Sequence, residues 1–155
     1  MEINQEVHRL SQVPMFSKVE KSKLKLLSFT SQSLEYQHGE LLFQEGESAD
    51  SIYLILEGEV EVLVKVENGA EDVIIRGENS LIGEMAVISK QGRSASVRAK
   101  GKVIALCIEA EVFLQLLTGN PEVALDVMKQ LSDKLTEAHH MNEHLQAQLS
   151  ALTQR

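Results

Sequence analysis

Runs of alternating apolar and polar residues, separated by glycine turns, dominate residues 40–108 of this chain. In the clearest run, 59–66, valine stands at every second position. A period of two places those side chains on one face of a β-strand. The tripeptide Glu67-Asn68-Gly69 then predicts a hairpin turn, and 77–80 predicts a second turn. Regular short strands joined by glycine turns favour a β-barrel or jelly roll.

Helical patterns flank this β-rich segment on both sides. Residues 3–12 and 19–28 predict two short helices before the strands, and 109–117 predicts a helix after them. Asn120 and Pro121 suit the cap and the first residue of a final helix.

The final helix carries an apolar heptad pattern over about four heptads. Its positions are Met128, Leu131, Leu135, Ala138, Asn142, Leu145, Leu149 and Leu152. A small barrel cannot cover a helix of this length, so we expect a homodimer formed through this helix. Asn142 at an a position suits a parallel two-stranded coiled coil. The alternative is a helix that folds back on its own domain, mainly near Met128 and Leu131. We therefore expect a β-roll domain over 1–120 and a dimerising helix over 121–155.

Arg93 is unexpected in its sequence context. If 93–99 is a strand, Arg93 shares a face with Ala95, Val97 and Ala99, and these small apolar residues indicate the inward face. A buried guanidinium is costly unless it is paired. Arg93 therefore needs an anion, which is either a carboxylate of the protein or a bound ligand.

The segment before Arg93 indicates what that anion could be. Gly83 allows a sharp bend or a close approach of the backbone. Residues 85–88 could form one helical turn whose first amides point outward, as in anion sites. Glu84 can accept hydrogen bonds from paired hydroxyls such as those of ribose. An arginine, free amides and a carboxylate together describe a nucleotide site.

These residues carry a family resemblance. The sequences GEMA at 83–86 and RSASV at 93–97 resemble the phosphate-binding cassette of cyclic nucleotide-binding domains. The block 46–58 resembles the early strand-and-turn signature of that family, and 13–16 resembles its N-terminal helical segment. The resemblance covers roughly residues 8–140. It implies a mainly β fold with flanking helices: a double-stranded β-helix (jelly roll) barrel followed by a long C-terminal helix.

The resemblance also implies a role for each cassette residue. Glu84 would bind the ribose 2′-hydroxyl, and Arg93 would bind the exocyclic phosphate oxygens. The implied nucleotide-binding set is Gly83, Glu84, Met85, Ala86, Arg93 and Ser94. The alternative is that the cassette is a vestige in which Arg93 pairs with Glu84.

The resemblance is less complete for the base. Serine follows the cassette arginine at Ser94, as in the catabolite activator proteins, and this favours cyclic AMP over cyclic GMP as the ligand. In those proteins a Thr-Ser pair on the long helix contacts adenine, and the corresponding position here is Ala138-His139. His139 is therefore a candidate base contact, or alternatively a solvated helix residue. Gly92 stands where the family often has proline, which loosens the preceding loop.

Composition restricts the remaining classes of protein. The 15 basic residues against 23 acidic ones give a net charge of −8, which argues against DNA binding by this chain. The single cysteine, Cys107, is expected to pack, and it fits a reducing cytoplasm. No run suggests a signal peptide or a membrane span.

His140 and His144 have zinc-compatible spacing without an evident further ligand, so no metal site is expected. No catalytic arrangement is evident, so an enzyme is the least expected class.

We therefore expect a cytoplasmic, homodimeric cyclic nucleotide sensor in which the ligand shifts the population of dimer conformations. One alternative is a dimerisation module of the same fold that binds no nucleotide. Another is the sensor part of a longer transcription regulator or signalling protein, because the helix-turn-helix of the DNA-reading members has no counterpart before Arg155. The downstream partner is not indicated.

Overall fold

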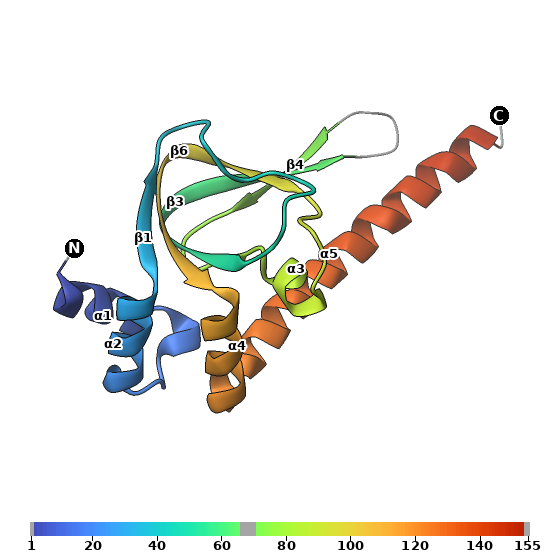
Figure 1. The fold of residues 1–155 in the computed structure, drawn as a ribbon. Coiled ribbons are helices and arrows are strands. Elements are labelled where there is room, and N and C mark those ends of the chain that lie inside the picture. The colour runs from blue at the N-terminus through green and yellow to red at the C-terminus, as the bar shows by residue number, and fades with distance from the viewer. Residues whose placement is uncertain (1, 66–70, 154–155) are drawn as a thin grey trace.

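The structure is a computed structural model that describes residues 2–65 and 71–153, and Figure 1 shows its fold. The elements follow in the order α1 (Ile3–Ser11), η1 (Pro14–Phe16), α2 (Lys21–Thr30), β1 (Gln32–Tyr36), β2 (Leu41–Phe43), β3 (Ser51–Lys65), β4 (Glu71–Arg76), β5 (Leu81–Ile82), α3 (Glu84–Ser89), β6 (Ser96–Glu109), α4 (Ala110–Gly119) and α5 (Pro121–Thr153). The predicted mainly β fold with flanking helices is confirmed.

The strands form one antiparallel sheet built around two long members, β3 and β6. The strand order is β1-β6-β3-β4, with β2 added to β6 and β5 added to β3. Because β3 and β6 are long and twisted, the sheet curls into a roll, in agreement with the predicted jelly roll (Figure 1).

Gly58 lies in a bulge that switches the faces of β3. Before it, Tyr53 and Ile55 point into the roll, whereas the even-numbered residues 52, 54 and 56 point toward the helices; after it, Val60 points into the roll. The pairing with β6 shifts register at this point. Gly58 has φ 88°, and a Cβ there would collide with the carbonyl oxygen of Lys102. The two predicted strands on either side of Gly58 are therefore one bent strand.

Two apolar cores result from this alternation. One lies between the sheet and the helices, where Phe16 and Phe113 are among its largest buried side chains. The other fills the roll, around Phe43, Tyr53 and Val97, and half-buried Cys107 packs against it as expected. The two cores therefore pack against opposite faces of β3 and hold the roll in place.

Two boundaries differ from the sequence prediction, and one predicted turn is not tested. The sheet begins earlier, because β1 was not recognised in a segment whose side chains are mostly exposed. The strand predicted from Arg93 begins only at Ser96, so Arg93 and Ala95 lie in the loop before β6; Val97 and Ala99 are buried as predicted. The predicted hairpin at Glu67-Asn68-Gly69 lies outside the described residues.

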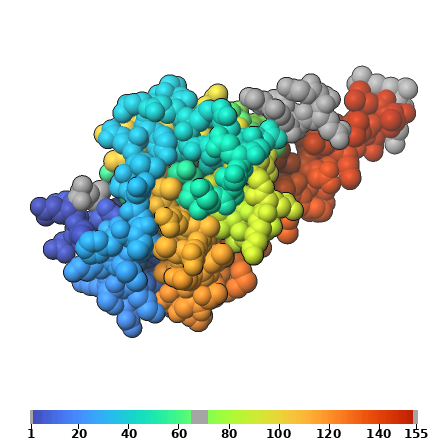
Figure 2. All heavy atoms as spheres, viewed as in Figure 1, coloured from blue at the N-terminus to red at the C-terminus, as the bar shows by residue number. Residues whose placement is uncertain are grey.

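The long helix α5 begins at Pro121 as predicted, packs against η1 and α4, and extends past the roll (Figures 1 and 2). The heptad positions divide between two directions. Leu131 packs against the core beneath the helices, and Ala138 and Leu145 face a cavity beside the roll. Leu135 is 74% exposed, and Met128, Leu149 and Leu152 are exposed as well.

None of the helices in the described part of the chain combines the length and apolar character needed to cross a membrane.

Candidate functional site

A cavity of about 460 Å³ lies between the roll and α5. One wall consists of the roll with α3 and the loop before β6, and the other wall is α5. The structure brings all six residues of the predicted nucleotide-binding set to this cavity: Gly83, Glu84, Met85, Ala86, Arg93 and Ser94. Residues far apart in the sequence, including Phe43 and Lys134, complete it.

Gly83 sets the geometry of the roll wall. It precedes α3 with φ 85°, a left-handed conformation that other residues adopt only with strain. A Cβ at this position would also collide with the guanidinium of Arg93. Glycine is therefore required here both for the turn into α3 and for the close approach of Arg93.

Arg93 is buried, with 4% of its surface exposed. Nη1 donates a hydrogen bond to the Gly83 carbonyl at 3.0 Å, and Nη2 donates to the Ser51 carbonyl. The guanidinium carbon lies 4.1 Å from the centre of the Phe43 ring, a cation–π distance. Nε has no hydrogen-bond partner. Burial lowers the pKa of Arg93.

The positive charge of Arg93 has no direct counter-ion in the described part of the chain: its partners are neutral carbonyls and aromatic rings. A guanidinium carries five N–H donors in a rigid fork that matches phosphate oxygens. The unbonded Nε–H and the lack of a direct counter-ion among the described residues make this site suited to an anionic ligand. The alternative pairing of Arg93 with Glu84 is not formed.

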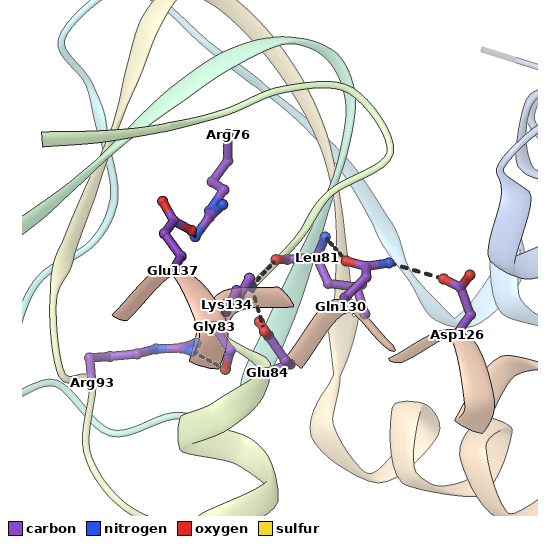
Figure 3. Close-up of polar contacts among 9 residues, drawn as sticks. All are labelled: Arg76, Leu81, Gly83, Glu84, Arg93, Asp126, Gln130, Lys134 and Glu137. Atoms are coloured by element: carbon purple, nitrogen blue, oxygen red, sulfur yellow. Dashed lines mark hydrogen bonds and ion pairs between the residues drawn. The ribbon is translucent and has the colours of Figure 1, made fainter. Parts of the chain in front are cut away.

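Glu84 pairs instead with Lys134, which reaches it from α5 (Figure 3). The Glu84 side chain is only 2% exposed, and that of Lys134 is 17% exposed. Lys134 Nζ donates to Glu84 Oε1 and also to the Leu81 carbonyl, at 3.0 Å. Sequence reasoning missed Lys134, because nothing in its local sequence distinguishes it from Lys129.

Further polar contacts hold α5 along the same face (Figure 3). The Leu81 amide donates to Gln130 Oε1 at 3.5 Å, and Gln130 Nε2 donates to Asp126 Oδ2 at 3.1 Å. Beyond Lys134, the half-exposed pair of Arg76 and Glu137 joins β4 to α5 at 2.9 Å. We call the contacts of Gln130, Lys134 and Glu137 with the roll the α5 latch.

The outer part of the cavity is apolar. Its lining here includes Val62, Val64, Ile74, Met141 and Leu145. Asn142, which the heptad pattern places at a coiled-coil position, also lines the cavity.

His139, the candidate base contact, is not among the residues that line this cavity. It is 66% exposed and lies 3.1 Å from Glu143 in an exposed pair on the helix surface. Its neighbour Ala138 does face the cavity. Among the described residues, no group of three or more potential metal-ligating side chains includes His140 or His144.

Comparison with known proteins places this geometry in a family. Residues 33–120 match the cyclic nucleotide-binding domain. A CRP-like cAMP-activated global transcriptional regulator of Mycobacterium tuberculosis is 24% identical over 84% of this chain and 59% of its own length. The catabolite activator protein of Thermus thermophilus has a similar structure, with a TM-score of 0.72 and 27% identity over 85% of this chain and 62% of that one.

A regulatory subunit of a cAMP-independent protein kinase A from Trypanosoma cruzi, bound to guanosine, is also similar. Its TM-score is 0.73, with 25% identity over 84% of this chain and 46% of that one. The chain spans between about a quarter and three-fifths of the length of the curated relatives it matches. The match to the family covers more than half of the chain, and it includes both the roll and the cassette. The chain belongs to the cyclic nucleotide-binding domain family.

Proposed function

We propose that this chain binds cyclic AMP in the cavity between the roll and α5, and acts as a sensor without catalysis of its own. The observation that carries the proposal is Arg93: a buried guanidinium with an unbonded Nε, no carboxylate at ion-pair distance in the described residues, and an open cavity beside it. A cyclic phosphate supplies the missing negative charge.

The other cassette residues complete the proposed binding set. Glu84 accepts hydrogen bonds from the ribose 2′-hydroxyl. Met85, Ala86 and Ser94 line the same cavity, and we propose that the amides of the first two and the hydroxyl of Ser94 cradle the phosphate together with Arg93. The purine lies against the apolar outer part of the cavity. Ser94 favours cyclic AMP, and the guanosine-bound relative makes cyclic GMP the comparison to test.

The proposed output is a change in a homodimer formed through α5. Leu135 and Leu149 are 74% and 62% exposed on a helix that extends past the roll, and a second copy of the helix would cover them. Because α5 also forms one wall of the cavity, the same helix would contact the ligand and carry the dimer interface. A cytoplasmic location stays a prediction, supported by the single cysteine.

Calorimetric titration with cyclic AMP and cyclic GMP tests the proposal. We expect micromolar or tighter binding of cyclic AMP, weaker binding of cyclic GMP, and an affinity loss of about 100-fold or more in Arg93→Ala, because charge-assisted bonds in a buried site are lost. Arg98→Ala is the matched control: Arg98 is in the following strand but pairs with Glu61 outside the cavity. Equal affinities of Arg93→Ala and wild type would reject the cassette as the binding site.

A second function is favoured by the Lys134 ion pair, because Glu84 is already satisfied without a ligand. In this reading the chain is a dimerisation module that binds no nucleotide. A folded dimer that gives no heat with either nucleotide would support it.

A further inference from the structure

Lys134 occupies the carboxylate that the proposed function assigns to ribose. The ammonium group bonds Glu84 Oε1 and the Leu81 carbonyl. The Glu84 side chain is only 2% exposed, and Lys134 contacts its carboxylate from α5 (Figure 3). A ribose hydroxyl that binds Glu84 Oε1 must therefore compete with the ammonium for that oxygen.

We propose that Lys134 is an affinity-determining residue of this site, a built-in competitor that the ribose 2′-hydroxyl displaces from Glu84. The inference rests on the proposed function. Both groups donate hydrogen bonds to the Glu84 carboxylate, and Lys134 already holds Oε1, so the ribose hydroxyl competes with the ammonium for this side chain. Glu84 lies on α3 and Lys134 lies on α5, so the ion pair that the ligand would break joins the two walls of the cavity.

Displacement of Lys134 removes the central contact of the α5 latch. The same ammonium bonds Leu81, whose amide is held by Gln130, and the pair of Arg76 and Glu137 lies one turn further along α5. A ligand that takes Glu84 from Lys134 thus loosens the helix that carries the exposed leucines. The ligand shifts α5 only by the difference between its affinities for the latched and released states.

Titration of matched variants with cyclic AMP and 2′-deoxy cyclic AMP tests the proposal. Lys134→Met removes the competitor at nearly unchanged length, and Lys134→Gln does so with a smaller change in polarity if the first variant does not fold. Lys134→Arg keeps a competing cation. Lys129→Met, an exposed lysine on the same helix, is the control.

We expect Lys134→Met and Lys134→Gln to bind cyclic AMP about tenfold more tightly than wild type, because a charge-assisted bond no longer has to be broken. Lys134→Arg and Lys129→Met should bind like wild type. 2′-Deoxy cyclic AMP lacks the hydroxyl that displaces Lys134, so its affinity should change little in any variant.

Three results would overturn the proposal. Unchanged or weaker cyclic AMP binding by Lys134→Met and Lys134→Gln excludes competition but leaves the proposed function standing. An equal gain for both ligands shows that Lys134 acts on the helix in general and not on the 2′-hydroxyl at Glu84. Absence of binding in wild type and in every folded variant rejects both this inference and the proposed function.

Discussion

The two walls of the cavity are held in different ways. The roll wall is fixed by strand pairing and by a buried core, and its cation, Arg93, has backbone carbonyls and aromatic rings as partners. The α5 wall is held over the cavity by side-chain contacts, and its cation, Lys134, is paired with a carboxylate. Among the described residues, the cation of the roll wall therefore has no direct carboxylate partner, whereas the cation of the α5 wall is paired with a carboxylate that a ligand could take over.

This difference separates binding from response. A site that recognises an anion benefits from a preformed cation, because little reorganisation is needed on binding. An element that responds to a ligand needs two arrangements of similar free energy. Packed strands favour the first property. The part of α5 beyond Leu131, which contacts the roll through a few polar pairs and the cavity lining, favours the second.

Gly83→Ala should give the largest effect, on the roll wall. The new Cβ would displace the Arg93 guanidinium, so we expect cyclic AMP affinity to fall by about 100-fold, as for loss of the charged contact. The left-handed backbone should also cost about 1 kcal/mol of folding stability. Calorimetry and chemical denaturation measure the two effects.

Gly39→Ala separates these two causes. Gly39 also has a positive φ, of 86°, but a Cβ there meets nothing within 4 Å. This variant should lose similar stability and keep its affinity for cyclic AMP. If it loses affinity to the same extent as Gly83→Ala, the effect comes from backbone strain and not from Arg93.

On the α5 wall, Lys134→Met should lower the free energy of unfolding by about 2 kcal/mol, because it leaves buried Glu84 without its partner. Arg93→Met should cost less, since no carboxylate of the described residues loses a counter-ion. Urea denaturation of both variants measures the difference. A larger loss in Arg93→Met than in Lys134→Met would reverse the comparison between the two walls.

The outward side of α5 can be tested through Leu135→Glu. If a second copy covers this 74% exposed leucine, the substitution should raise the dimer dissociation constant by about tenfold or more. Sedimentation equilibrium measures it. Leu26→Glu, at a 64% exposed leucine on α2, is the control. A dimer that resists Leu135→Glu would place the interface elsewhere.

The interior of the roll should show the smallest effect, at alkaline pH. Burial, with a smaller contribution from Tyr53, raises the pKa of Tyr36 to about 12. The folded protein therefore favours the neutral phenol, so this stability is fully present below the ordinary pKa near 10 and declines as the pH rises toward 12. Denaturation across that range should show the decline, and Tyr36→Phe should reduce it. An unchanged slope in Tyr36→Phe would contradict this assignment.

The predictions from sequence were strongest where a residue type has few structural uses. Gly83 is an unusual residue directly before a helix, and Arg93 is an unusual charge among apolar neighbours. Both residues line the cavity. The prediction was weaker where local pattern is uninformative. The strand β1 has mostly exposed side chains, and Arg93 lies in a loop whose apolar alternation resembled a strand.

His139 and Lys134 show the limit of reasoning by position. The position of His139 along the helix suggested that it contacts the base. Its side chain is instead exposed beside Glu143, and it is not among the residues that line the cavity. Lys134 reaches Glu84 only because α5 crosses the roll at one angle and in one register. A rotation of the helix by one residue would exchange such neighbours, and that rotation is set by the packing of Val123, Val127 and Leu131 against the core, not by the residues around Lys134.

The sequence by itself determined the alternating strands, the turn at 77–80, the cassette and the long amphipathic helix, because these depend on periodicity and on residues with narrow conformational preferences. Tertiary structure alone decided that Glu84 pairs with Lys134 and not with Arg93, and that the heptad positions divide between the domain and solvent. The physical reason is that pairing between distant side chains depends on how packed elements are oriented, and the two buried cores set that orientation.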